Sequence, residues 1–147
     1  MDNNVRFTEK IALVATIDPA TLANTEQFSD VVDMSKYHQV AGFLFLGNIA
    51  AETVDFKAYS CDSNGSNAVA LKTATQLAAH ASNNDGVQIA IGVRPQDLLA
   101  SGKQYVKFGA VTGGATGGPA CVAVFACDLR QGLAADADLS SVVELKN

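Results

Sequence analysis

The sequence predicts an all-β protein, an antiparallel β-sandwich or jelly roll of about eight strands with little helix. Three observations lead to this prediction. Short apolar runs follow the period of two that marks strands, clusters of Gly, Asn and Pro separate these runs, and hardly any segment has the spacing of a helix. At 147 residues the chain suffices for one domain with its own core. The expected organisation is an N-terminal arm and linker over 1–30, a β-sandwich domain over 31–130 and a C-terminal tail over 131–147.

The N-terminal part predicts a strand or an extended arm from Val5 to Ile17. The pair Asp18-Pro19 is expected to end it, because aspartate caps helices and proline favours their first position, which leaves room for one helical turn over 20–23. The apolar pattern resumes over 28–34.

Two runs are apolar at every position, over 40–46 and over 121–127. A strand of this kind needs cover on both faces, from sheet, from another layer or from another subunit. We therefore expect both runs to form central strands.

Three further runs alternate between apolar and other residues, over 53–60, 87–93 and 105–111. Alternation of this kind marks a strand with one buried face. The residues expected to point inward are Val54, Phe56 and Ala58 in the first run, Val87, Ile89, Ile91 and Val93 in the second, and Val106, Phe108 and Ala110 in the third.

The turns follow from glycine, asparagine and proline. Asn64-Gly65 predicts a hairpin with a returning strand over 68–72, and the glycine-rich stretch 113–119 predicts a second hairpin, between the runs 105–111 and 121–127. A short helical turn is expected over 95–100, before Gly102. Residues 73–82 have both helical spacing and strand neighbours, so helix and strand stay open there.

Composition excludes several classes of function. The net charge is −5 at pH 7, and the scattered basic residues offer no stripe for nucleic acid. No run of about 20 apolar residues is present to span a membrane, and the start lacks the pattern of a signal peptide, so we expect a chain kept inside a cell. The cysteines Cys61, Cys121 and Cys127 are expected to be reduced thiols.

No motif predicts catalysis, a cofactor or a metal site. The stretch 113–119 lacks the lysine of a phosphate-binding loop, and Asp62, Asn64 and Ser66 lack the glycine and glutamate positions of a calcium loop. The two histidines have no ligand spacing, and no cysteine or serine stands in a nucleophile motif. We therefore expect a protein that is not an enzyme, with no catalytic residues, no cofactor and no metal.

The order of the segments between Val31 and Arg130 resembles that of small virion proteins of tailed bacteriophages, some of which are head decoration (cement) proteins. The segments that carry the resemblance are 31–37, 54–57 before the Asn-Gly turn, 88–91, 103–107, and 122–124 closed by Asp128-Leu129-Arg130.

The resemblance implies a β-fold subunit that binds the assembled capsid through the major capsid protein and stabilises it by bridging capsomers. It further implies a homo-oligomer, with a trimer favoured, on the outer surface of the capsid after assembly in the host cytoplasm, with no nucleic acid or membrane partner. The alternatives are a tail or neck component of the virion, and a carbohydrate-binding β-sandwich module on it. With no tryptophan and three tyrosines, the chain has few residues for a sugar-binding platform.

Apolar residues at both ends are expected to make the subunit or capsid contacts, since many weak contacts gain strength when repeated. The alternative is that both ends pair as edge strands within their own subunit. The residues expected at these contacts are Val5, Phe7, Ile11, Leu13, Leu139, Val142, Val143 and Leu145.

Overall fold

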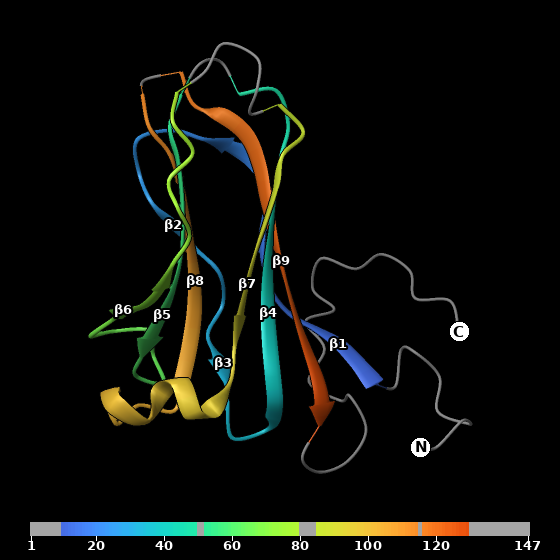
Figure 1. Cartoon of the computed structure of the whole chain (residues 1–147), viewed down its shortest axis with the longest axis vertical. Helices are drawn as coiled ribbons and strands as arrows, with labels where there is room; N and C mark the ends of the chain where they lie inside the picture. Colours follow the sequence, from blue (N-terminus) through green and yellow to red (C-terminus); the bar gives the residue numbers. More distant parts are fainter. Residues whose placement is uncertain (1–9, 50–51, 80–84, 115, 130–147) are drawn as a thin grey trace.

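The computed structural model of the chain describes residues 10–49, 52–79, 85–114 and 116–129. These residues form two antiparallel sheets packed face to face, so the predicted β-sandwich is confirmed (Figure 1). Sheet A contains, in spatial order, β1 (Ile11–Leu22), β9 (Gly118–Leu129), β4 (Tyr37–Leu46) and β7 (Gln88–Val93). Sheet B contains β2 (Gln27–Phe28), β8 (Tyr105–Thr112), β5 (Val54–Cys61) and β6 (Val69–Thr73), with β3 (Val32–Asp33) also paired to β8.

The core lies between the two sheets, where alternate residues of the strands point inward. Val40 and Leu44 of β4 are fully buried, and the rings of Phe56 and Phe108 stack with centroids 5.9 Å apart. The inward residues predicted for β5 and β8 are all buried, and so are Ile91 and Val93 of β7. The two runs that are apolar throughout form β4 and β9, which are the central strands of sheet A as expected.

The connection between β8 and β9 differs from the predicted hairpin. The two strands belong to opposite sheets, so the chain crosses over the top of the sandwich after Thr112 (Figure 1). The Glu52 carboxylate holds the crossing, because its Oε1 accepts hydrogen bonds from the backbone N–H groups of Thr116 (3.1 Å) and Gly117 (2.9 Å). The glycines do form a turn after Thr112, but β9 then pairs with β1 and β4 in sheet A and not with β8.

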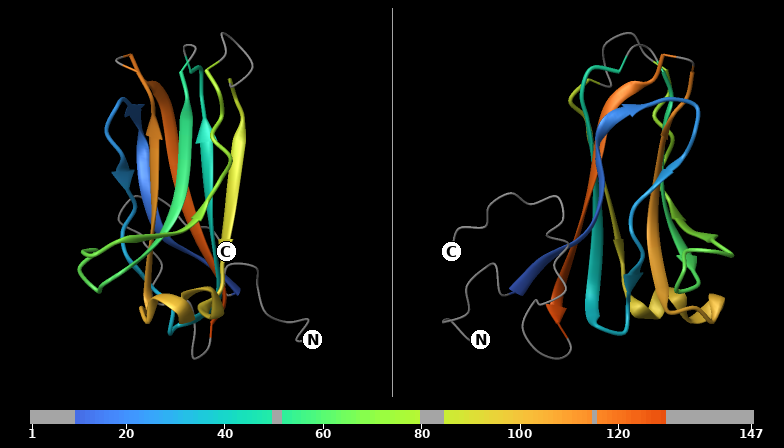
Figure 2. Two further views of the ribbon diagram at one scale, coloured as in Figure 1. Left: turned by 60° about the vertical axis from the view of Figure 1, so that its left-hand side comes forward. Right: turned by 180° about the vertical axis from the view of Figure 1, so that it is seen from behind.

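Strand β1 continues through Asp18-Pro19 to Leu22, so the predicted helical turn over 20–23 is wrong. Pro19 is tolerated because β1 is an edge strand of sheet A, where a missing N–H breaks no ladder on the open side. Its register against β9 shifts between Ile17 and Ala20, next to the proline. Beyond Leu22 the chain passes over to sheet B and enters β2 (Figure 2).

Residues 74–79, in the part of 73–82 that the structure describes, form no helix, and Leu77 makes an isolated β-bridge to Val54. Leu77 and Val54 exchange two backbone hydrogen bonds of 3.0 Å, and Ala74 N–H donates to the carbonyl of Phe56. Pairing with β5 thus outweighs the helical spacing.

A short 3-10 helix, η1 (Pro95–Ser101), closes the lower end of the sandwich, as predicted (Figure 1). Within η1 the side chain of Leu98 is buried, and Gly102 ends the helix in the left-handed backbone conformation, with φ of 65°. Lys72 Nζ of β6 donates to the Asp97 carboxylate (2.7 Å) and to the carbonyl of Gly92 in β7 (2.8 Å), so one lysine joins the edges of the two sheets.

We expect Asp97→Asn to weaken this junction in a pH-dependent way. Hydrogen bonds from Lys72 and from the Arg94 backbone lower the pKa of Asp97. A carboxyl whose folded pKa lies below the unfolded value of about 3.9 adds stability above that pH and loses it as the pH falls through the folded pKa. The pair is partly exposed, so the loss at neutral pH should be only about 0.5–1 kcal/mol.

Urea unfolding of both forms at neutral and at acid pH measures this difference. The two stabilities should converge in acid, where the native carboxyl is protonated as well. A difference of equal size at both pH values would show that Asp97 acts through its shape and not through its charge.

Candidate interaction surface

The outward side of sheet A is apolar along its central strands β4 and β9, whereas β1 turns Thr16 and Asp18 to this side beyond Leu13. On β4 and β9 the alternate residues that do not enter the core point outward, and the register places residues of β1 and β7 beside them. We call this set the outer face; all of its members are half-buried or exposed. It consists of Ile11, Leu13, Gln39, Ala41, Phe43, Phe45, Gln88, Ala90, Cys121, Ala123, Phe125 and Cys127.

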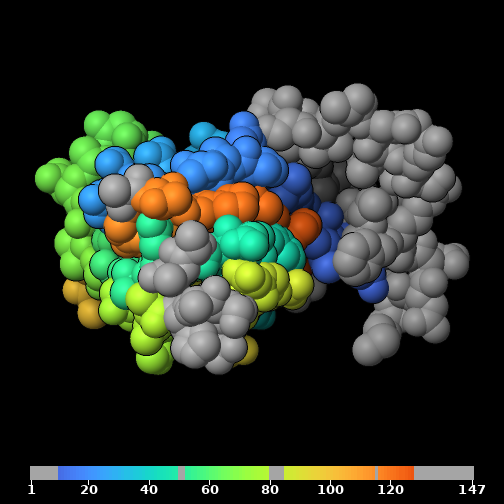
Figure 3. Space-filling view, turned by 90° about the horizontal axis from the view of Figure 1, so that it is seen from above, coloured from blue at the N-terminus to red at the C-terminus, as the bar shows by residue number. Residues whose placement is uncertain are grey.

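None of these twelve residues carries a charge. Seen from above, β1 in blue, β9 in orange, β4 in teal and β7 in yellow-green lie side by side in that order (Figure 3). Monomers rarely expose a contiguous apolar area of more than a few hundred Å², and larger areas mark interaction sites.

Three phenylalanines form the centre of the outer face. The Phe43 ring lies edge-on to Phe125, with centroids 6.0 Å apart, and near-parallel to Phe45 at 6.5 Å. Phe45 stays 36% exposed. A hollow of about 460 Å³ opens between these rings, Ile11 and Gln88.

A second apolar hollow adjoins the first on the other side of Phe45. Its volume is about 400 Å³, and it lies where the upper parts of β1, β4 and β9 meet. Pro19, Phe45, Pro119 and Cys121 are among the residues that line it. Phe45 thus lines both hollows of the outer face.

Ile11 and Leu13, two of the residues predicted for subunit or capsid contacts, belong to the outer face. Ile11 pairs with Cys127 and lines the larger hollow, and Leu13 pairs with Phe125. The structure therefore brings these two predicted residues together with the phenylalanine cluster. The other predicted contact residues, Val5, Phe7, Leu139, Val142, Val143 and Leu145, lie outside the described residues.

The cysteines are free thiols, as expected from the sequence. Cys61 is buried in sheet B, whereas Cys121 and Cys127 are half-buried on the outer face. Burial raises the pKa of the Cys61 and Cys121 thiols, which keeps them protonated at neutral pH. Burial thus disfavours the thiolate form of Cys61 and Cys121.

The outward side of sheet B has the opposite character. The Tyr59 hydroxyl donates to the Glu26 carboxylate (2.7 Å), and Lys107 Nζ lies 4.0 Å above the Phe28 ring while donating to the Gly65 carbonyl (2.9 Å). Burial, and then the bond to Glu26, raise the pKa of Tyr59. Charged and polar groups thus lie on this side of the sheet, as the alternation over 53–60 predicted, together with the Phe28 ring, which is 44% exposed.

The turn at Asp62, whose sequence lacks the pattern of a calcium loop, is held by hydrogen bonds from nitrogen donors. The carboxylate accepts from Asn67 Nδ2 (2.7 Å) and Lys103 Nζ (3.2 Å), and Ser66 N–H donates to the Asn64 side chain (3.0 Å). These hydrogen bonds, that of Asn67 first, lower the pKa of Asp62. Within the described ranges, no three His, Cys, Asp or Glu side chains gather closely enough to hold a metal ion.

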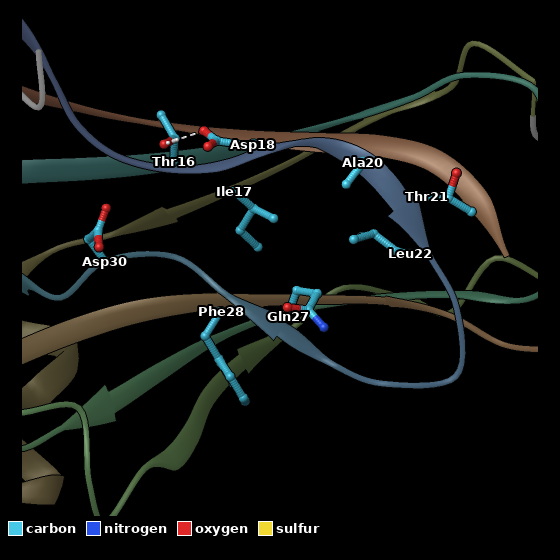
Figure 4. A pocket seen from close by; sticks show the side chains of 9 residues that line it. All are labelled: Thr16, Ile17, Asp18, Ala20, Thr21, Leu22, Gln27, Phe28 and Asp30. Carbon is cyan, nitrogen blue, oxygen red and sulfur yellow. Dashed lines mark hydrogen bonds between the residues drawn. The ribbon is translucent and has the colours of Figure 1, made fainter. Parts of the chain in front are cut away.

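A polar hollow of about 410 Å³ lies at the open side of the sandwich, between β1 and β2 (Figure 4). Ile17 and Leu22 point into it from β1, whereas Thr16 and Asp18 hydrogen-bond each other (3.3 Å) on the other side of that strand. The hollow is formed by the crossing of the chain from sheet A to sheet B. Its side chains do not converge on one point, so it lacks the arrangement of a binding site for a small polar molecule.

Comparisons with known proteins relate the fold to other β-sandwiches. No protein-family model and no curated protein sequence matches the chain. Among solved structures, SPBc2 prophage-derived protein YomS is similar with a TM-score of 0.50 and 14% identity, over 86% of this chain and 100% of that one.

Two further similar structures have lower scores. One comes from Bacillus endospore appendages, which form disulfide-linked pili (TM-score 0.45, 12% identity, 86% of this chain and 98% of that one). The other is infectious bursal disease virus VP2 in a subviral particle (TM-score 0.42, 12% identity, 86% of this chain and 36% of that one). At these identities the likeness to YomS establishes the sandwich fold and nothing more.

Among the described residues, no helix has the length and apolar character that would let it cross a membrane.

Proposed function

We propose that the protein is a structural subunit of a phage virion, a decoration or cement protein. It binds the major capsid protein on the outer surface of the assembled shell and stabilises that shell. The observation that carries this proposal is the outer face: twelve uncharged residues, three of them phenylalanines, on one side of a sandwich whose other side carries charged groups such as Lys107 and Glu26.

The outer face supports assembly with other protein chains. Aromatic and apolar side chains without charges are typical of the buried centre of an interface, where charged residues are depleted. Two of the residues that the sequence assigned to such contacts, Ile11 and Leu13, belong to it. A protein that binds a shell at many equivalent sites gains strength from repetition, so no deep pocket is needed at each site.

The fold is compatible with this role. Sandwiches host many functions, so the fold by itself assigns none. YomS, whose fold is similar, is prophage-derived, and this origin agrees with a phage protein. The absence of a charged stripe over the outer face agrees with a protein partner in place of nucleic acid. A tail or neck component would use the same surface in another part of the particle.

Carbohydrate binding is less well supported. The rings of Phe28 and Tyr59 on sheet B stand at 72° to each other, and Lys107 occupies the face of Phe28, so this pair makes no flat platform. The outer face offers a sugar only Gln39 and Gln88 as strong hydrogen-bonding side chains, whereas sugar sites place several polar groups around each ring.

Co-sedimentation tests the proposed function. The full chain is mixed with empty shells assembled from the major capsid protein of the same virion, and the shells are heated with and without it. We expect the chain to sediment with the shells and to raise their temperature of disruption. A chain that stays in the supernatant at every concentration contradicts the proposal, and binding to detached tails or necks in its place would support the alternative within the virion.

A further inference from the structure

Strand β7 forms one edge of sheet A, and among the described residues no further strand lies beside it (Figure 2). Edge strands are usually protected against pairing with other chains by prolines, charges, bulges or short length. β1 contains Pro19 and two register shifts, β6 has a register shift and Lys72, and β2 and β3 have two residues each. The six residues of β7 include no charge and no proline, and their register against β4 is regular throughout. β7 therefore lacks the protection that the other edge strands have.

A hydrogen bond at the start of β7 shows which of its backbone groups face β4. The N–H group of Leu46 donates to the carbonyl of Val87 (3.1 Å), so these two residues form a hydrogen-bonded pair. Hydrogen-bonded and non-bonded pairs alternate along an antiparallel ladder. The regular register therefore makes Ile89 and Ile91 the next residues of β7 that bond to β4.

Gln88 and Ala90, which alternate with these residues, turn their N–H and C=O groups to the free side of the strand. Both residues are exposed, and no hydrogen bond reaches these groups within 10–49, 52–79, 85–114 and 116–129. Gly92 follows the same alternation, and its carbonyl accepts from Lys72 Nζ (2.8 Å), which agrees with the direction inferred for this set. Gln88 and Ala90 thus offer two donors and two acceptors along an open edge.

These groups are arranged so that the edge matches itself. When a second β7 runs antiparallel to the first with Ile89 opposite Ile89, Gln88 of each copy lies opposite Ala90 of the other. Gln88 and Ala90 then exchange two hydrogen bonds, and the two-fold symmetry repeats the exchange. All four groups of each copy are paired in this register, and the Gly92 carbonyl keeps its bond to Lys72.

Charges at the two ends of β7 favour a copy of the same chain as the occupant. Asp85 precedes the strand and Arg94 follows it, and both are exposed. Asp97, the nearest carboxylate to Arg94 in the sequence, is paired with Lys72. In the two-fold register Asp85 of one copy comes beside Arg94 of the other, at both ends of the contact. These opposite charges offset the repulsion between two chains of net charge −5, and an unrelated strand would need the same two charges at the same spacing.

We propose that two copies of the chain pair edge to edge through β7, antiparallel and two-fold symmetric about Ile89. The four strands of sheet A in each copy then join into one continuous sheet of eight. The two-fold axis stands perpendicular to this sheet, so both outer faces lie on the same side of it. The pairing uses the backbone of β7 and leaves the outer faces open for the contact in the proposed function. It goes beyond that function, because it concerns the chain alone and needs no capsid.

Sedimentation of the full chain over the micromolar to millimolar range tests the pairing. The contact is small, so we expect the wild type to dimerise in the upper part of this range. Ala90→Pro removes the N–H group that pairs across the edge but breaks no bond to β4, and proline is tolerated on edge strands, as Pro19 is in β1. It should weaken dimerisation by about a hundredfold or more. Ala90→Ser is the matched control, because it changes the same side chain and keeps the N–H group, so the dimer should persist.

Exchange of the end charges tests whether the second strand comes from the same chain. Asp85→Arg and Arg94→Asp each place like charges together at both ends of the contact, and each should weaken dimerisation by about tenfold or more. The double variant with both changes restores opposite charges at each end and should recover most of that loss. A partner of another sequence would give no such recovery.

Thermal unfolding of each variant verifies that it is folded, and the charge variants leave β7 itself unaltered, so they test the pairing even where the proline variant does not fold. A wild type that stays monomeric at every concentration overturns the inference. So do a dimer that survives Ala90→Pro and a double charge variant without recovery. A trimer by mass overturns it as well, because a two-fold edge contact closes with two copies.

The two proposals fail in different ways. Wild-type chains that stay monomeric but sediment with shells overturn the pairing and leave the proposed function standing. Chains that dimerise but do not bind shells or other parts of the virion support the pairing and contradict the proposed function. Ala90→Pro separates the two contacts, because it keeps the phenylalanines of the outer face, and this variant should still sediment with shells.

Discussion

Replacing Phe108 with alanine is expected to lower the free energy of unfolding by about 3–5 kcal/mol, the usual cost of truncating a buried phenylalanine. Phe108 lies on β8, within sheet B, and its side chain is fully buried. Its ring stacks on Phe56 at an interplanar angle of 24° and faces Gly42 of the opposite sheet, so its loss leaves a cavity in the middle of the sandwich. Urea unfolding followed by circular dichroism measures the change.

Phe45→Ala is the matched control for this substitution. The same atoms are removed, but from the outer face, where the ring is 36% exposed. The loss should be about 1–2 kcal/mol, because part of the ring is already in water and its removal leaves no closed cavity. A loss as large as that of Phe108→Ala would contradict the placement of Phe45 outside the core.

The strands of the sandwich could be predicted because the alternation of inward and outward side chains in a strand is a pattern of neighbouring residues in the sequence. Val54, Phe56 and Ala58 are buried and alternate with half-buried neighbours, as the pattern required. The runs that are apolar throughout predicted β4 and β9 as central strands. Their pattern also indicated that both faces of these strands need cover, from sheet, from another layer or from another subunit.

The pairing of the strands could not be predicted in the same way, because it depends on residues far apart in the chain. Glycines after Thr112 predicted a turn, but not whether the next strand returns to the same sheet or crosses to the other. Pro19 is a strong local signal for the end of a strand, and it is tolerated in β1 because that strand lies at an edge. The apolar residues around Leu77 have the spacing of a helix, yet two backbone hydrogen bonds between Leu77 and Val54 hold this segment against β5.

The candidate site was predicted in part. Ile11 and Leu13 were identified because they were apolar residues outside the expected core, and they do lie on the outer face. Phe43, Phe45 and Phe125 were not identified, because a phenylalanine in a run that is apolar on both faces can point either way. The register resolves this ambiguity: Phe43 pairs with Ala123 and Ala41 with Phe125, on the side opposite Leu44 and Val124.

Gly42→Ala is expected to destabilise the protein by about 1–3 kcal/mol through crowding in the core. A methyl group at this position would lie 2.5 Å from Cδ1 and 2.6 Å from Cε1 of the Phe108 ring. The ring is fully buried and stacked on Phe56, so it cannot move aside without disturbing the packing between the two sheets. Gly92→Ala is the control, because its methyl group would meet only the Gln39 amide, at 3.7 Å, and the stability should change little.

Combining Gly42→Ala with Phe108→Ala tests the cause of the crowding. If the clash with the ring is responsible, the methyl group should cost far less once the ring is gone, since it then occupies part of the cavity. The two losses would not add, as expected for residues in direct contact. If the losses did add, the cost of Gly42→Ala would come from the backbone of β4, and the close approach of the two sheets at this point would not depend on glycine.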